Sequence, residues 1–267
     1  MRPHWTTRSR PERDAVTTIV SLHAHPDDEA LLTGGWLAQR AAAGDRVVII
    51  FATDGNAELA STDSRCVATL GHRRRAEASE SARALGVARV RWLGHADSGM
   101  AGSPSALPDR FVHVPLERAA RAVAAVLDEE DADVLTGYDA NGGYGHPDHV
   151  HVHRVARRAQ QLAARRPRLL EATMDRTWLV RLLRVVRPFR GLLPGVSIPG
   201  DDIFTEPSAL LMRIDVRDDL DAKLAALAAH HTQATGGVRT IRLLLALPRP
   251  LARQVLGTEW FTEVRHD

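Results

Sequence analysis

The sequence predicts an α/β protein with a mostly parallel central sheet, because short apolar runs alternate with longer segments of helical periodicity. The runs 17–24 and 46–53 are short and rich in β-branched residues, as buried strands are. The segment 115–131 instead repeats its apolar residues at helical spacing. Strands joined by helices of this length pair in parallel, and right-handed crossovers place the helices on both faces of the sheet.

The elements follow one another in a regular order. The first strand, TTIVSLHA, is expected over 17–24, and a helix over about 29–43 follows it. The second strand, RVVIIFAT, is expected over 46–53, where turn residues bound it. Gly86 is the expected C′ residue of a helix over 72–86, since glycine readily adopts the left-handed conformation there. The further expected elements are a strand over 87–94, a helix over 115–131, a strand over 133–139, a helix over 149–166, a strand over 209–216 and a helix over 218–231.

The composition is that of an ordinary globular protein, with 267 residues of which 44% are hydrophobic and 25% charged. A formal charge of +2 is too small to indicate nucleic-acid binding. The single cysteine, Cys66, excludes an internal disulfide framework and fits a reducing cytoplasm, which is the expected location. The start of the chain lacks the apolar core of a secretory signal, and no apolar run reaches the ~18 residues of a membrane span.

Two polar motifs follow predicted strands, at the edge of a parallel sheet where ligands bind. HPDDE, residues 25–29, comes directly after the first strand, and GYDANGGYGHPDH, residues 137–149, overlaps the end of the fourth. Each HPD tripeptide contains a proline that restricts the preceding histidine to an extended conformation. Adjacent carboxylates beside a histidine are costly to desolvate at the end of a buried strand. A bound cation would offset that cost.

A divalent cation could be held by residues from both motifs. His25 and Asp28 lie three residues apart in one turn, and His149 can supply a third ligand from the other loop. Two imidazoles and a carboxylate leave one position for water, as catalytic zinc sites do.

Three neighbours of these ligands have side chains suited to hydrolysis. Asp27, beside a ligand, could accept a proton from the water. His146 could stabilise a developing oxyanion or protonate the leaving nitrogen. Asp148 could orient and charge that histidine through a hydrogen bond. The two motifs therefore predict a metal-dependent hydrolase.

AHPDDE together with GGYGHPDHVHVH resembles the LmbE-like (PIG-L) family of zinc-dependent N-deacetylases, most of all its mycothiol-biosynthesis deacetylase and mycothiol S-conjugate amidase branch. The resemblance covers 17 to about 165 and implies a Rossmann-like sandwich. It implies Zn²⁺ as cofactor, with Fe²⁺ or another divalent ion as the alternative. The implied reaction removes an N-acyl group, typically N-acetyl, from a small-molecule amino sugar such as an N-acetylglucosamine glycoside.

The same resemblance assigns individual residues. It makes the expected metal ligands His25, Asp28 and His149, and it makes the expected general base Asp27. His146 matches the family's electrostatic catalyst, and Tyr144 matches a tyrosine that assists at the tetrahedral intermediate. The expected substrate contacts are Arg74, Asp97, His230 and Gln233.

A single catalytic domain over 1–267 is expected, since no repeat or low-complexity linker divides the chain. Residues 1–15 are expected to be flexible, and 17–165 carry the motifs. The part from 175 to 267 is less regular and is expected to form a smaller C-terminal extension that shapes the substrate site.

The sequence leaves the substrate and two other function classes open. The loop TDGNAELAST, residues 53–62, departs from the glutamate- and glycine-rich loop of mycothiol-type enzymes, and 175–200 do not align with them. An amidase that cleaves a mycothiol-type conjugate is therefore an alternative. A non-haem iron oxygenase is another, because two histidines and a carboxylate also form a facial triad. A sugar-binding protein without catalysis is the third.

One basic amphipathic segment, residues 176–195, stands apart from the motifs. Its arginines recur at every third position, at Arg181, Arg184, Arg187 and Arg190. The simplest expectation is a short surface helix whose apolar face packs on the sheet. The alternative is a segment that receives an apolar or anionic part of the substrate, including a lipid-linked sugar at a membrane surface. The sequence does not predict an oligomeric state.

Overall fold

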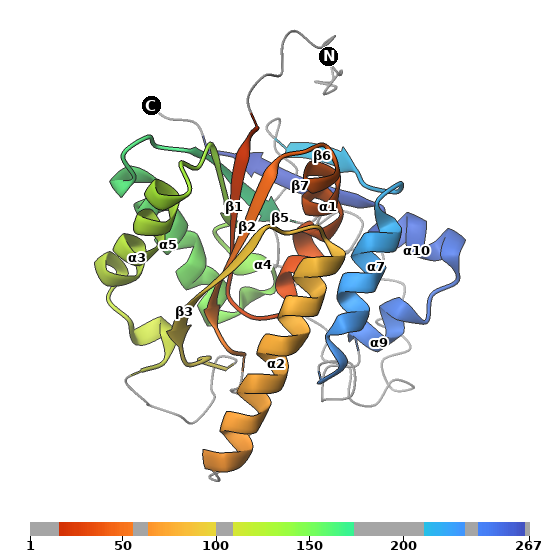
Figure 1. Ribbon diagram of the computed structural model, residues 1–267, viewed down its shortest axis with the longest axis horizontal. Helices are drawn as coiled ribbons and strands as arrows, with labels where there is room; N and C mark the ends of the chain where they lie inside the picture. Colours follow the sequence, from red (N-terminus) through yellow and green to blue (C-terminus); the bar gives the residue numbers. More distant parts are fainter. Residues whose placement is uncertain (1–15, 56–63, 100–108, 174–210, 233–239, 265–267) are drawn as a thin grey trace, which may run out of the picture.

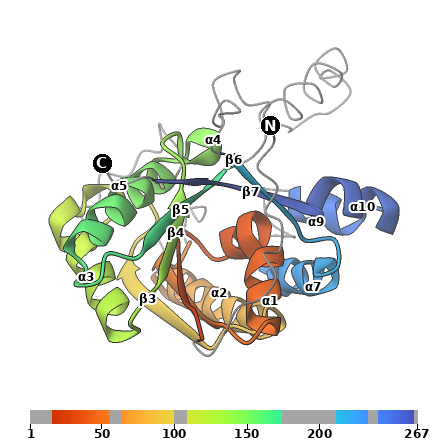
Figure 2. The same cartoon turned by 90° about the horizontal axis from the view of Figure 1, so that it is seen from above.

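The computed structural model describes residues 16–55, 64–99, 109–173, 211–232 and 240–264. These residues form a seven-stranded sheet of order β3-β2-β1-β4-β5-β7-β6 (Figures 1 and 2). The basic segment 176–195, the expected flexible start 1–15 and Gln233 lie outside them.

The predicted mostly parallel sheet is confirmed. Its parallel strands are β1 (Thr18–His23), β2 (Arg46–Thr53), β3 (Arg89–His95), β4 (Val134–Tyr138) and β5 (Arg168–Thr173). At one edge, β7 (Thr258–Glu263) runs antiparallel to both β5 and β6 (Leu211–Asp215).

The strand order places a topological switch point between β1 and β4. Ile19 pairs with Val47 of β2 on one side and with Val134 of β4 on the other. From this point the chain builds the sheet outward in both directions, so the connections after β1 and β4 diverge and leave a crevice. The two polar motifs follow these two strands, so the topology brings them to one crevice.

Helices cover both faces of the sheet because side chains of successive strand residues alternate between the faces. Val20 and Leu22 pack with α3 (Leu116–Glu129) and α5 (Pro147–Leu162), whereas Ile19 packs with α1 (Gly34–Ala42). Figure 2 shows the same division, with α3 and α5 on one side and α1, α2 and α7 on the other. The remaining elements are η1 (Glu29–Thr33), α2 (Ser64–Ala84), η2 (Phe111–His113), α4 (Gly142–Gly145), α7 (Leu220–Ala229), α9 (Thr240–Leu245) and α10 (Arg249–Leu256).

Several boundaries differ from the expected ones. The helix expected over 29–43 begins as the π-helical turn η1 and continues as α1, and the helix expected over 72–86 already begins at Ser64. Strands β5 and β7 and helices α9 and α10 were not expected. The C-terminal part is thus more regular than its pattern indicates, because β7 completes the sheet through pairing with β5, about ninety residues earlier.

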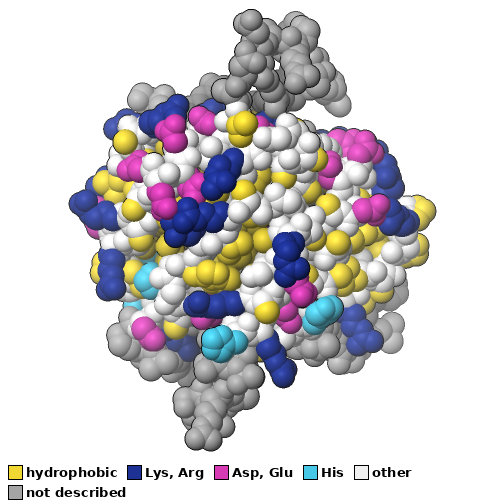
Figure 3. Space-filling model, viewed as in Figure 1, with side chains coloured by type: hydrophobic (Ala, Val, Ile, Leu, Met, Phe, Trp, Pro, Cys, Tyr) yellow, Lys and Arg dark blue, Asp and Glu magenta, His cyan; other side chains and the backbone are white. Residues whose placement is uncertain are grey.

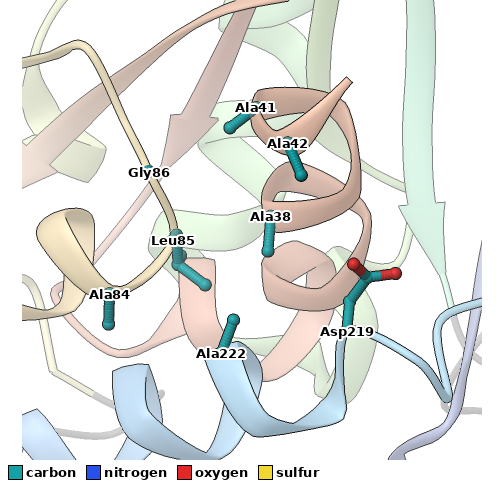
Figure 4. A pocket seen from close by; sticks show the side chains of 8 residues that line it. All are labelled: Ala38, Ala41, Ala42, Ala84, Leu85, Gly86, Asp219 and Ala222. Carbon is teal, nitrogen blue, oxygen red and sulfur yellow. The ribbon is translucent and has the colours of Figure 1, made fainter. Parts of the chain in front are cut away.

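Two features of the surface do not involve the residues of the two motifs. An open pocket between α1, α2 and α7 is lined mainly by alanines, with Asp219 at its rim (Figure 4). It adjoins the carboxyl-terminal half of α1, whereas HPDDE precedes that helix. Basic and acidic side chains are interspersed over the face viewed in Figure 3. Within the described ranges, no helix is both long enough and apolar enough to cross a bilayer.

Candidate metal centre and catalytic site

The HPDDE motif forms a tight turn between β1 and η1. Asp27 has a φ of 113°, a region that non-glycine residues rarely occupy and that is enriched at functional sites. Its carbonyl oxygen accepts hydrogen bonds from the backbone of Ala30 and Leu31, both at 3.1 Å. Asp28 turns inward and accepts the backbone N–H of His25 at 3.0 Å. The turn thereby fixes two expected ligands and the expected base.

The second motif is held by Asp139, which follows β4 directly. Its carboxylate accepts the N–H groups of Asn141 and Gly143 at 3.1 and 3.0 Å and the hydroxyl of Thr173 at 2.6 Å. Gly142 has a φ of 59°, and a Cβ there would lie 2.8 Å from Cβ of His149, so the loop requires glycine. These contacts bring the start of α5 against the crevice.

Three nitrogen and oxygen atoms from the two motifs form a compact triangle. Nδ1 of His25, Oδ2 of Asp28 and Nε2 of His149 are separated by 3.4, 3.2 and 3.4 Å. Tetrahedral zinc with bonds of about 2.0–2.2 Å separates its ligand atoms by about 3.4 Å. All three residues are buried. The expected ligand set therefore fits one tetrahedral cation and leaves its fourth position to water or substrate.

Two other groups of donor atoms lie within 4.8 Å of one another among the described residues. The first is His25, His146 and His149, and the second is His25, Asp97 and Asp148. The ring of His146 lies 4.5 Å from that of His25 and 5.1 Å from that of His149, measured between centroids. His146 thus borders the triangle, at a distance suited to contact with a group bound there.

The backbone of α5 determines which ring nitrogen of His146 carries the proton. This residue is the N-cap of the helix, and its Nδ1 accepts the N–H of Asp148 at 3.2 Å. A neutral ring with an accepting Nδ1 carries its proton on Nε2. Burial, with the nearby His25 and His149, lowers the pKa of His146 to about 4. The residue is therefore a neutral donor at physiological pH.

The carboxylate of Asp148 contacts His25 instead of the expected His146. Its Oδ2 lies 3.2 Å from Nε2 of His25 and accepts the N–H of Ser98 at 2.9 Å. Oδ1 of Asp97 lies 3.4 Å from the same histidine nitrogen. A carboxylate on the second nitrogen of a ligating histidine fixes its orientation and raises its basicity. The hydrogen bond to His146 comes from the backbone of Asp148, not from its side chain.

Asp27 has the environment of a base that titrates near neutral pH. Burial, and next the charge of Asp28, raise the pKa of Asp27 to about 8. Burial opposes ionisation of Asp28 as well, but His149 and His25 outweigh it and lower its pKa well below the usual range. A divalent cation on Asp28 would lower the pKa of Asp27, since a cation favours the carboxylate form. A base with a pKa near the working pH is the most effective.

The other expected site residues are distributed as follows. Arg74 is buried, and its guanidinium lies against Gly55, where a Cβ would overlap it and would come within 3.2 Å of Pro26. His230 is fully buried, and its Nε2 lies 2.7 Å from Oε1 of Glu29. The side chain of Tyr144 and the whole of Gln233 lie outside the described residues.

Two site residues were missed in the sequence. Tyr138 ends β4 and stacks on His149, and its hydroxyl accepts the N–H of Ala24 at 3.0 Å. Glu29, the third acid of HPDDE, is fully buried beside Asp27. An aromatic residue with a polar tip at the end of a motif-bearing strand was the available signal for Tyr138.

Comparisons with known proteins agree with this geometry. Residues 20–160, which contain both motifs, match the family described as PIG-L: GlcNAc-PI de-N-acetylase. A relative from Thermomonospora curvata is 36% identical over 93% of this chain and 91% of its own. A relative from Thermobispora bispora is 36% identical over 91% of this chain and 87% of its own. Both are named 1D-myo-inositol 2-acetamido-2-deoxy-alpha-D-glucopyranoside deacetylase.

Solved structures share the fold at lower identity. N,N'-diacetylchitobiose deacetylase from Pyrococcus horikoshii has a TM-score of 0.60 at 21% identity, with 93% of this chain and 84% of that chain covered. The A40926 pseudoaglycone deacetylase Dbv21 has a TM-score of 0.62 at 19% identity, with coverages of 95% and 99%. The hydratase GalB from Pseudomonas putida reaches 0.59 at 16% identity, with coverages of 94% and 98%, so the fold alone does not determine the reaction.

The relatives at 36% identity are N-deacetylases of an acetylated amino sugar by name, which is the class that the family resemblance of the two motifs implies. The match over residues 20–160 and the 36% identity to these relatives show that the chain belongs to the PIG-L (GlcNAc-PI de-N-acetylase) family.

Proposed function

We propose that the protein is a zinc-dependent N-deacetylase that acts on an N-acetylglucosamine glycoside, with N-acetylglucosaminyl inositol as the favoured substrate. The observation that carries this proposal is the triangle of His25, Asp28 and His149, which has the dimensions of a tetrahedral zinc site and lies beside Asp27. The names of the relatives at 36% identity support the inositol glycoside in particular.

Each residue around the triangle has a part in amide hydrolysis. Zinc bound there would polarise the acetamide carbonyl and lower the pKa of a water. Asp27 accepts a proton from the attacking water, and the same carboxyl group can return it to the leaving amine. Nε2–H of His146 donates a hydrogen bond to the oxyanion that forms when the water oxygen bonds to the carbonyl carbon. Cleavage of the C–N bond then gives acetate and a free amine.

The remaining polar groups support ligand orientation and sugar binding. Asp148 and Asp97 hold Nε2 of His25, so that Nδ1 faces the metal position. Asp97 and the buried Arg74 lie close enough to the triangle and the HPDDE turn to contact sugar hydroxyls. Both remain proposals as substrate contacts.

A panel of amides tests the substrate assignment. Zinc-loaded protein is assayed for free amine with N-acetylglucosaminyl inositol, N,N'-diacetylchitobiose and a mycothiol-type S-conjugate. The proposal expects the highest kcat/KM for the inositol glycoside. Faster cleavage of the conjugate would assign the protein to the amidase branch, and no amine from any acetamide would refute deacetylation.

A further inference from the structure

Glu29 is a buried acid that is not part of the ligand triangle of His25, Asp28 and His149 and is not the proposed base. Its Oε2 accepts the backbone N–H of Asp27 at 2.8 Å. Its Oε1 accepts the hydroxyl of Ser81 at 2.5 Å and lies 2.7 Å from Nε2 of His230. The side chain is fully buried. One carboxylate therefore joins the HPDDE turn to α2 and to the end of α7.

The contact with Asp27 bears on an unusual backbone conformation. A φ of 113° is unfavourable for a residue with a Cβ, so surrounding contacts must maintain it. The carbonyl group of Asp27 is held by Ala30 and Leu31, and its N–H is held by Glu29. With both peptide groups fixed, the direction of the Cα–Cβ bond of Asp27 is fixed as well, and this bond sets the region that the carboxylate can reach.

Glu29 can hold Asp27 because it is itself immobilised. A buried carboxylate requires hydrogen-bonding partners, and Ser81 of α2 and His230 at the C-cap of α7 supply them from two helices that pack against each other. His230 lies at the C-cap of α7 and is fully buried. Its Nε2 contacts Glu29, and through this carboxylate His230 anchors the HPDDE turn.

We propose that Glu29, anchored by Ser81 and His230, is a positioning residue that aims the carboxylate of Asp27 at the attacking water. This inference rests on the proposed function of Asp27 as the base. It predicts that loss of Glu29 lowers turnover without loss of the metal, because the ligand triangle does not include Glu29. Misplacement of a reacting group by about 1 Å can lower a rate by about 10²-fold.

Glu77 provides a matched control. It is a buried acid on α2, one turn before Ser81, and it anchors the same C-terminal segment. Its Oε1 accepts the N–H of Thr232 at 3.0 Å, and its Oε2 accepts the hydroxyl at 2.6 Å. A variant at Glu77 therefore removes the contacts with Thr232, two residues after His230, and keeps the contacts of Glu29 with Asp27, Ser81 and His230.

The test compares Glu29→Met with Glu77→Met in zinc-loaded protein. We expect Glu29→Met to lower kcat about 10–10²-fold with KM and zinc stoichiometry unchanged, and Glu77→Met to lower the melting temperature with kcat close to that of the wild type. Glu29→Gln should recover most of the loss, since its amide oxygen can accept the N–H of Asp27. An unchanged kcat in Glu29→Met, or equal losses in both Met variants, would overturn the proposal.

A double-mutant cycle separates positioning from a general structural effect. In an Asp27→Asn background, Glu29→Met should have little further effect on kcat, because the two residues act through one group. The same fold-loss in both backgrounds would refute the proposal. If Glu29→Met does not fold, Ser81→Ala enters the same cycle and should show a smaller loss that also disappears with Asp27→Asn.

Crystallography tests the inference even if the wild type releases no amine and the proposed function fails. In the Glu29→Met crystal structure, Asp27 should leave the positive φ region and its carboxylate should turn away from the ligand triangle. An Asp27 that keeps its φ and its side-chain direction would overturn the positioning role independently of any assay.

Discussion

Tyr138 lies flat against His149, with ring centroids 4.4 Å apart and an interplanar angle of 28°. The last residue of β4 thus supports an expected metal ligand in the first turn of α5. The hydroxyl of Tyr138 is tied to the backbone of Ala24 and lies 3.3 Å from Nδ1 of His23, both on the β1 side of the crevice. One aromatic side chain therefore connects the two motif-bearing segments beneath the ligand triangle.

This relationship predicts a metal-binding effect at Tyr138. Tyr138→Leu should weaken zinc affinity about 10–100-fold, the range for residues that orient metal ligands. Tyr138→Phe keeps the stacked ring and should lose less zinc affinity than Tyr138→Leu. Competition with a chelator of known affinity measures both, and equal affinity in Tyr138→Leu and the wild type would show that the ring does not orient His149.

His149 and His146 should respond differently to substitution. His149→Ala removes a corner of the triangle and should abolish stoichiometric zinc binding. His146→Ala should retain one zinc per chain and lower kcat about 10²–10³-fold, as loss of an oxyanion donor does. Elemental analysis and kinetics distinguish them, and loss of zinc from His146→Ala to the same extent would make His146 a ligand.

The pH dependence of kcat/KM should report the ionisation of Asp27, the proposed base. Only ionised Asp27 accepts a proton, so kcat/KM should fall as the pH falls through the pKa of that residue. Burial and Asp28 raise this pKa to about 8, and a bound cation lowers it, which places the acidic limb below pH 8. Asp27→Asn should retain zinc, lose about 10²–10⁴-fold in kcat and lose this limb. An unaltered limb in that variant would assign it to another group.

Stability should depend on a buried ion pair that contains no residue of the two motifs. Nζ of Lys223, the only lysine in the chain, lies 2.6 Å from Oε1 of Glu259. That carboxylate also accepts the N–H groups of Gly35 and Trp36 at the start of α1, both at 2.8 Å. Lys223→Met leaves a buried carboxylate without its countercharge and should lower the free energy of unfolding by about 3–5 kcal/mol.

Urea denaturation measures this effect, and Lys223→Met/Glu259→Gln should recover part of the loss because the amide is neutral. A loss of less than about 1 kcal/mol in Lys223→Met would show that the pair contributes little net stability.

The sequence could predict that His25, Asp28 and His149 converge because they lie in two short motifs that follow parallel strands. The proline and glycine positions fix both turns locally, and the parallel sheet brings the strand ends together. His25, Asp28 and His149 meet as expected for these reasons, and the same local patterns predict β1 to β4 closely.

What the sequence could not show depends on contacts between distant segments. Asp148 bonds to His25, which lies 123 residues earlier, and the local spacing had suggested His146 instead. Glu29 meets His230 across 201 residues. Strand β7 is half-buried and finds its partner β5 only in the folded sheet, so its own pattern gave little signal.

Zinc-dependent deacetylation is tested by titrating metal-free protein with zinc and measuring acetate release from N-acetylglucosaminyl inositol. We expect activity to rise with zinc and to saturate at one zinc per chain, and we expect His149→Ala to show neither binding nor activity. Activity that survives complete removal of the metal, or a fully zinc-loaded wild type that releases no acetate, would contradict it.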